Sequence, residues 1–128
     1  MPCTTFSKAR KWDGLGPGPL RSETELWGIT GLSRTDQKKV DAGNRLLWFS
    51  LRLLKLCERF RIPYVLENPH SSMAWSMPPM KNFIHRYNPG ILTLDFCQFG
   101  EAWKKPTTLM YHYVDIGMLA LRCIPTGN

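Results

Sequence analysis

The stretch from about Thr35 to Arg61 constrains the fold most, because its apolar residues recur at the spacing of one helix face. Thr35 or Asp36 can cap the start of this helix, and Pro63 prevents its continuation and biases Ile62 toward extended backbone. The sequence therefore predicts one long helix, whose buried stripe consists of Val40, Leu47, Leu51, Leu54 and Cys57.

Three short apolar runs have the composition of β-strands, and we place them near residues 63–67, 91–96 and 107–113. The first run follows the long helix directly, which is typical of a βαβ unit with a parallel sheet. The other two can pair as a hairpin, and a short helix is expected over 81–87. We therefore expect an α/β fold: a partial Rossmann-like layer with a short, mostly parallel sheet, one long helix and a C-terminal hairpin.

The chain before the long helix is predicted to be a loop, within a single domain that spans residues 1–128. Five glycines and prolines fall between Gly14 and Pro19, and this density disfavours regular structure. Residues 1–34 form a basic, Gly/Pro-rich segment, whose cations include Lys8, Arg10, Lys11 and Arg21. Long basic loops are often functional rather than simple connectors.

Charge and cysteine usage indicate the kind of partner and the compartment. Lysine and arginine number 17 against ten acidic residues, and the formal charge of +7 favours a polyanion such as nucleic acid. The four cysteines form no CxxC pair, so we expect free thiols in a reducing intracellular compartment, the cytoplasm or the nucleus, and no metal site. No apolar stretch reaches the length of a membrane helix, so no membrane association is expected.

Three motifs occur in a fixed order: Pro-Cys-Thr-Thr-Phe-Ser at 2–7, Glu-Asn-Pro at 67–69, and Phe-Gly followed by Trp-Lys-Lys-Pro-Thr within 99–107. In this order they resemble the DNA (cytosine-5) methyltransferase family, in a divergent branch of viral or mobile-element type. That family has a Pro-Cys loop with a Phe-Ser pair, a strand that ends in Glu-Asn, and a later Gln-x-Arg-x-Arg element. The third motif is similar in placement only, with lysines where the family prefers arginines.

The resemblance implies an S-adenosylmethionine-dependent methyl transfer to carbon 5 of cytosine in DNA. Cys3 would add to carbon 6 of the ring, Glu67 would act as the acid at nitrogen 3, and Asn68 would orient the loop or the base. The target base would be flipped out of the duplex. The expected DNA contacts are Ser7, Arg10, Asn44, Lys104 and Lys105.

The position of the glycine-rich segment argues against methyl transfer by this chain alone. The family binds its methyl donor at a glycine-rich turn upstream of the Pro-Cys loop, whereas the glycines at 14–18 follow Cys3 and are interrupted by prolines. We therefore expect a fragment that begins at the catalytic loop, and we do not expect it to bind the donor tightly or to turn over alone.

Asn44 lies on the same helix face as Val40, so its amide is either satisfied inside the core or faces a cleft.

Other readings of the sequence remain open. A basic nucleic-acid-binding module without catalysis would use Trp12, Trp27 and Trp103 for stacking. An amino-methyltransferase relative would use the Asn-Pro step at 68–69, although His70 and Ser71 replace the proline and aromatic residue expected there. A third reading is a chain that does not fold stably alone, because missing sheet strands would expose edges that invite aggregation.

Overall fold

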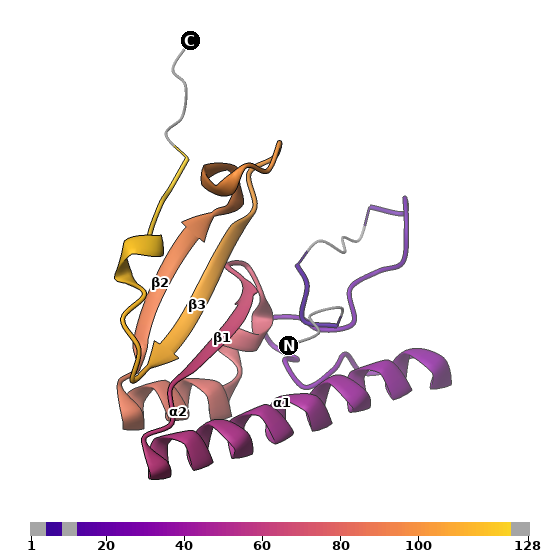
Figure 1. Ribbon diagram of the computed structural model, residues 1–128. Helices are drawn as coiled ribbons and strands as arrows, with labels where there is room; N and C mark the ends of the chain where they lie inside the picture. The colour runs from indigo at the N-terminus through magenta and orange to yellow at the C-terminus, as the bar shows by residue number, and fades with distance from the viewer. Residues whose placement is uncertain (1–4, 9–12, 124–128) are drawn as a thin grey trace.

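The computed structural model describes residues 5–8 and 13–123 of the 128-residue chain. It contains two helices, α1 (Arg34–Phe60) and α2 (Pro78–Tyr87), and three strands, β1 (Tyr64–Pro69), β2 (Gly90–Asp95) and β3 (Pro106–His112) (Figure 1). Each strand lies within two residues of its predicted position. The described residues before Arg34 form no helix or strand.

Helix α1 begins and ends close to the predicted residues. Ser33, rather than Thr35 or Asp36, caps it, because the Ser33 hydroxyl accepts a hydrogen bond from the Asp36 amide at 3.2 Å. Arg61 adopts a left-handed conformation after the last turn, and Pro63 follows. The buried stripe consists of Val40, Leu47, Leu51, Leu54 and Glu58, whereas the predicted member Cys57 is only partly buried.

The prediction of a mostly parallel, Rossmann-like sheet is wrong. The three strands form one sheet in the order β1-β3-β2, and β3 pairs antiparallel with both neighbours. Strands β1 and β2 run in the same direction, since both are antiparallel to β3. They do not pair, however, because β3 lies between them, and every ladder is therefore antiparallel.

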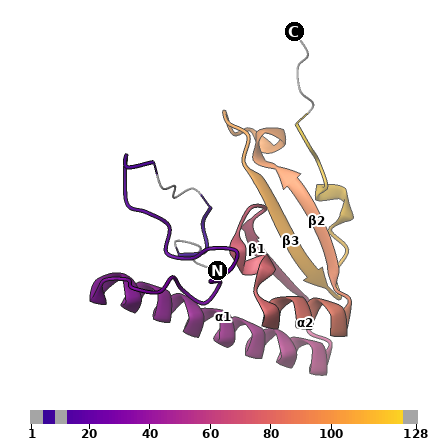
Figure 2. The ribbon, with the colours of Figure 1, turned by 180° about the vertical axis from the view of Figure 1, so that it is seen from behind.

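The two faces of the sheet are covered by different parts of the chain. Helices α1 and α2 pack on one face, where Tyr64 and Met110 join the main core (Figure 1). On the opposite face a smaller cluster of Leu92, Leu94 and Leu109 is covered by Ile116 and Leu119 of the segment after β3 (Figure 2). In the described part of the chain, no helix is long and apolar enough to cross a membrane.

A buried carboxylate joins α1 to the sheet. Glu58 accepts hydrogen bonds from the Tyr64 and Tyr113 hydroxyls at 2.7 and 2.9 Å, and its carboxylate lies 2.7 Å from the His112 ring nitrogen. Burial by itself raises the pKa of Glu58, but the three hydrogen bonds outweigh it and hold that pKa below its ordinary value. The glutamate is therefore charged and satisfied inside the fold.

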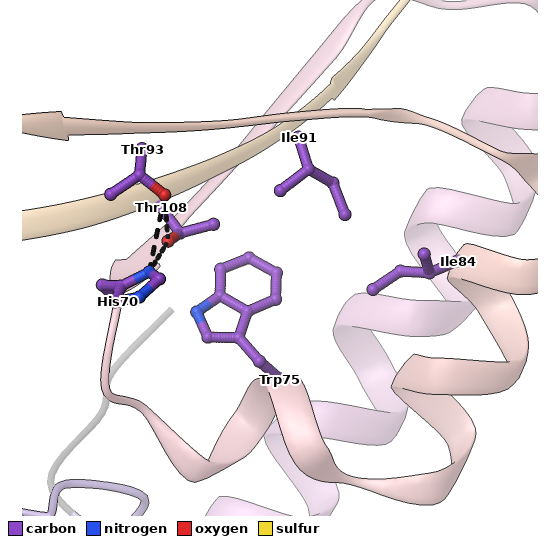
Figure 3. Close-up of a pocket in the computed structure, with 6 residues that line it drawn as sticks. All are labelled: His70, Trp75, Ile84, Ile91, Thr93 and Thr108. Atoms are coloured by element: carbon purple, nitrogen blue, oxygen red, sulfur yellow. Dashed lines mark hydrogen bonds between the residues drawn. The ribbon is translucent and has the colours of Figure 1, made fainter. Parts of the chain in front are cut away.

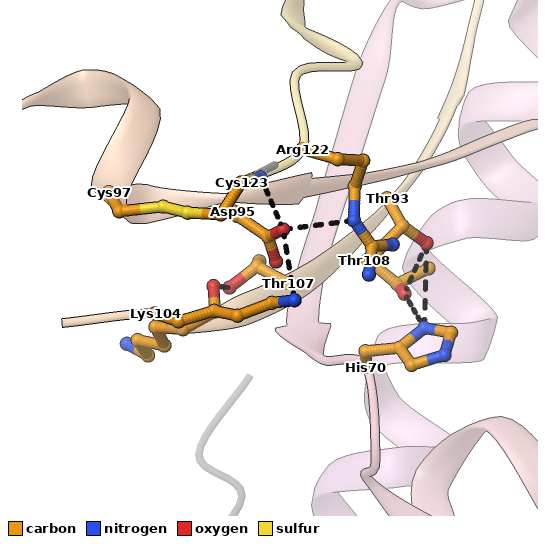
Figure 4. Close-up of polar contacts among 10 residues, drawn as sticks. His70, Thr93, Asp95, Cys97, Lys104, Thr107, Thr108, Arg122 and Cys123 are labelled. Carbon is orange, nitrogen blue, oxygen red and sulfur yellow. Dashed lines mark hydrogen bonds and ion pairs between the residues drawn. A yellow bond between two sulfur atoms is a disulfide. The ribbon is translucent and has the colours of Figure 1, made fainter. Parts of the chain in front are cut away.

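The expectation of four free thiols is also wrong. Cys97, after β2, and Cys123, near the end of the described chain, form a disulfide, and Cys57 is free. Their separation of 26 residues in sequence gave no pairing signal, because no motif relates them. The disulfide holds the segment after β3 against the end of β2 (Figure 4).

Candidate functional site

The described end of the first motif docks beside the segment that follows the second. The Phe6 side chain is fully buried in the main core, and its backbone carbonyl accepts a hydrogen bond from the Met73 amide at 2.8 Å. Met73 begins a short 3-10 helix just after β1, and the Trp75 indole N–H of the same turn donates to the Pro69 carbonyl at 3.0 Å. Two motifs sixty residues apart in sequence are thus neighbours in the fold.

A buried arginine, Arg21, holds the described end of the first motif in place. The Arg21 guanidinium donates to the Thr5 hydroxyl at 3.1 Å and to the Asn44 side-chain oxygen at 2.7 Å, and it lies 3.8 Å from the centre of the Phe6 ring. It also donates to the backbone carbonyls of Leu26 and Val40. Burial lowers the pKa of Arg21 to about 10. The arginine therefore ties the first motif to α1.

Gly43 of α1 makes room for this contact. A Cβ at this position would lie 2.5 Å from the Thr5 hydroxyl oxygen and 2.9 Å from a guanidinium nitrogen of Arg21. The glycine therefore serves close packing in the middle of a helix, where it otherwise costs stability.

Asn44 has internal partners at both ends of its amide. It accepts from Arg21, and its N–H group donates to the Trp27 carbonyl at 3.1 Å. Of the two alternatives for Asn44, the structure thus favours an amide that is hydrogen-bonded inside the fold over one that faces a cleft. The DNA contact expected of Asn44 stays a prediction. Ser7 is half-buried next to Phe6. Cys3 and Arg10 lie outside the described residues.

Glu67 and Asn68 point to opposite faces of the sheet, as consecutive strand residues must. Glu67 pairs with Leu109 on the face away from the helices and is exposed to solvent. Asn68 pairs with Thr108 on the helix side and is fully buried, and among the described residues neither its amide oxygen nor its nitrogen has a hydrogen-bond partner. A buried amide without partners costs stability, so this position calls for an explanation beyond packing.

The predicted phosphate contacts lie in the connection between β2 and β3. Lys104 is half-exposed, with its ammonium 3.7 Å from the buried Asp95 carboxylate, and the Lys105 ammonium lies 5.1 Å from the centre of the Phe96 ring. Asp95 also accepts hydrogen bonds from Arg122 and from the Cys123 amide (Figure 4). Burial raises the pKa of Asp95, but these donors and Lys104 outweigh it and hold that pKa below its ordinary value.

A small cavity on the helix side of the sheet was not anticipated from the sequence. It measures about 200 Å³, and Trp75, Ile84 and Ile91 form its apolar wall. Its polar edge consists of His70, whose Nδ1 lies 2.9 Å from the Thr108 hydroxyl, and of Thr93, 3.2 Å from the same hydroxyl (Figure 3). The only sequence signal was the pair of threonines, which the antiparallel register places opposite each other.

The described residues do not fit a site for S-adenosylmethionine. The glycines at 14–18 are mostly exposed loop positions, and no strand precedes them in the described chain, so they form no turn between a strand and a helix. The described residues also bring together no three histidine, cysteine or acidic side chains as metal ligands. We therefore derive no step that passes through a donor or a metal.

The arrangement places the first motif beside the end of β1, with an exposed carboxylate and a basic connection on the same small sheet. Comparisons with protein-family models, with curated protein sequences and with solved structures find no match for this chain.

Proposed function

We propose that this chain is the base-activating part of a DNA (cytosine-5) methyltransferase-like enzyme. The observation that carries the proposal is the hydrogen bond between the Phe6 carbonyl and the Met73 amide, which anchors the first motif next to the strand of the second. A shared site for the Cys3 thiol and the Glu67 carboxyl requires their two motifs to be close, although Glu67 projects from the sheet face opposite to the one on which Phe6 packs.

The proposed chemistry begins at carbon 6 of cytosine. The Cys3 thiolate adds to carbon 6 and forms a sulfur–carbon bond, while the electron pair of the ring double bond moves toward carbon 5. The Glu67 carboxylic acid protonates nitrogen 3 and so accepts the charge that would otherwise build up in the ring. Because Glu67 is exposed to solvent, a cytosine that has been flipped out of the duplex can reach its carboxyl group.

These residues predict a reaction that requires no methyl donor. Carbon 5 of the adduct takes a proton from water and then loses its original hydrogen to water as a proton. The sulfur–carbon bond then breaks with departure of the thiolate, and nitrogen 3 returns its proton to Glu67, so that cytosine is regenerated. The net result is exchange of the carbon 5 hydrogen with solvent. Methyl transfer itself would need a donor held by residues other than those described, and we assign none of them to it.

DNA binding is proposed for the connection between β2 and β3. Lys104 and Lys105 are both exposed there, and Trp103 beside them has 62% of its surface exposed. Cations position a phosphate backbone, and an exposed indole stacks on a base once it is unpaired.

The test is release of tritium from duplex DNA labelled at carbon 5 of cytosine, with no methyl donor present. We expect time-dependent release by the intact chain, none by Cys3→Ser, and a loss of about 100-fold in Glu67→Gln, as is typical of a removed general acid. Asp115→Asn changes an exposed carboxylate after β3, outside the proposed DNA-binding connection, and is expected to keep full activity. Equal release by Cys3→Ser and the intact chain would contradict the proposal.

A nucleic-acid-binding module without catalysis is the second candidate, favoured by the exposed Trp103 that directly precedes Lys104 and Lys105. Trp27 does not serve it well, because its ring stacks on Trp48 with 5.9 Å between centres. Salt-dependent DNA binding that Trp103→Ala weakens, together with no tritium release by any variant, would favour this candidate.

A further inference from the structure

Helix α1 carries a second apolar stripe on the face turned away from the core. Its members are large side chains that are half or more exposed, with exposed fractions of 63%, 51%, 50% and 63% for Phe49, Leu53, Leu56 and Phe60. They are spaced by four, three and four residues, and the same spacing extends back to Leu46 and Ala42. This is the spacing of the a and d positions of a coiled coil.

A basic row runs along one side of this stripe, which we call the outer seam (Ala42, Leu46, Phe49, Leu53, Leu56 and Phe60). Its residues recur every seven positions, as g positions do, and they are Lys38, Arg45, Arg52 and Arg59. None of them forms a salt bridge within the described chain. Along the outer seam the other flank has the small, uncharged Gly43, Ser50 and Cys57, and Asp36 precedes them at the same spacing.

The basic row borders a groove that continues the surface toward α2. Arg52, Lys55 and Arg59 line it together with Leu56 and Tyr87, and its volume is about 490 Å³. A groove with three cations and an apolar floor is suited to acidic side chains that project from an apolar helix.

A second copy of this chain fits the outer seam poorly. The acidic residues of α1 are engaged elsewhere: Asp36 pairs with Lys39, Asp41 accepts from Gln37, and Glu58 is buried. Helix α1 of a second copy therefore offers the basic row no free carboxylate, and each copy carries a formal charge of +7. Charge complementarity instead points to an acidic partner.

We propose that the outer seam of α1 is a docking surface for an amphipathic helix of another polypeptide, with leucine-like residues at its a and d positions and a glutamate or aspartate at every seventh position facing the basic row. The surface lies on the opposite side of α1 from the core, and the inference does not depend on the proposed methyltransferase chemistry.

The test uses two synthetic peptides of about four heptads, both with leucine at a and d. One peptide has glutamate at its flanking positions and the other has lysine, and each is titrated into the intact chain by calorimetry. We expect the glutamate peptide to bind at least about tenfold more tightly, because several ion pairs change from attractive to repulsive. The combined variant Arg45→Glu, Arg52→Glu and Arg59→Glu is expected to reverse this preference.

A reversal of preference cannot come from a folding defect, because the variant must then bind the lysine peptide. Lys81→Glu, an exposed residue outside α1, is the matched charge control and is expected to keep the preference for glutamate. Equal affinity for both peptides would overturn the proposal. So would dimers of the chain that Leu53→Asp disperses, or binding to phosphatidylserine vesicles by a chain that binds neither peptide.

Discussion

Replacement of Asn68 by leucine is expected to stabilise the fold while it impairs the proposed chemistry. The Asn68 side chain is fully buried, and both polar atoms of its amide lack a hydrogen-bond partner in the part of the chain that the structure describes. A buried polar group without a partner costs about 1–3 kcal/mol. Leucine has the same branched shape and no polar atom, although its two methyl groups are larger than the amide oxygen and nitrogen. Removal of the amide should therefore recover part of that cost, less the cost of the added volume.

We expect Asn68→Leu to raise the free energy of unfolding by about 2 kcal/mol, with an unchanged slope in urea. For a domain of this size, that gain corresponds to a Tm about 8 °C higher. The assay is urea and thermal unfolding followed by circular dichroism, with tritium release from cytosine measured on the same samples. If Asn68 is retained for the base or the catalytic loop, the more stable variant should also release tritium more slowly.

Asn44→Leu is the informative comparison, because both ends of the Asn44 amide are hydrogen-bonded. That change leaves a buried guanidinium short of one acceptor and should destabilise the fold by about 2–4 kcal/mol. Asn82→Leu alters an exposed asparagine of α2 and should change stability by less than about 0.5 kcal/mol. A destabilisation of Asn68→Leu by more than about 1 kcal/mol would refute the prediction that removal of this amide is a net gain for the fold.

Three further changes test the packing around the site. Arg21→Leu should destabilise the fold by about 3–5 kcal/mol in urea unfolding, because it removes the hydrogen bonds from a buried guanidinium to four acceptors, and Arg21→Lys should recover only part of the loss. Gly43→Ala should cost about 1–3 kcal/mol in the same assay, since the clash with Thr5 outweighs the better helix propensity of alanine. The folded pKa of Glu58 lies below its ordinary value of 4.5, so its contribution to stability is present above that pH and is lost as the pH falls through the folded pKa. Unfolding free energies measured from pH 7 to pH 3 should therefore fall less steeply for Glu58→Gln.

Each of these has a result that would count against it. An Arg21→Leu chain as stable as the original would mean that the first motif does not depend on this anchor. A Gly43→Ala chain of increased stability would mean that Thr5 moves aside at no cost. An identical pH dependence in Glu58→Gln would mean that Asp95, whose pKa is also lowered, accounts for the acid sensitivity alone.

Local patterns in the sequence were sufficient for the elements but not for their pairing. The spacing of Val40, Leu47, Leu51 and Leu54 and the stop at Pro63 located α1, and three apolar runs located the strands. The strand order β1-β3-β2 could not be predicted from local patterns, because it depends on β3 lying between β1 and β2 and pairing with both. A strand–helix–strand pattern is compatible with both parallel pairing and an inserted antiparallel strand.

The candidate site was predictable only at the level of residue types. The motifs named Glu67 and Asn68, but the alternation of a strand sends these two side chains to opposite faces. Arg21 was noted only as a basic loop residue, since nothing local reveals that its partners are Thr5, Asn44 and two distant carbonyls. The disulfide between Cys97 and Cys123 likewise depends on a tertiary contact.

The most direct measurement of the central claim is covalent trapping on a duplex that contains 5-azacytosine. The nitrogen at position 5 takes a proton once a thiolate has added to carbon 6, so the adduct persists long enough for peptide mass spectrometry. The proposal predicts a nucleotide adduct on Cys3 that is absent from Cys3→Ser and reduced in Glu67→Gln. An adduct on Cys57, or DNA binding with no adduct on any cysteine, would contradict it.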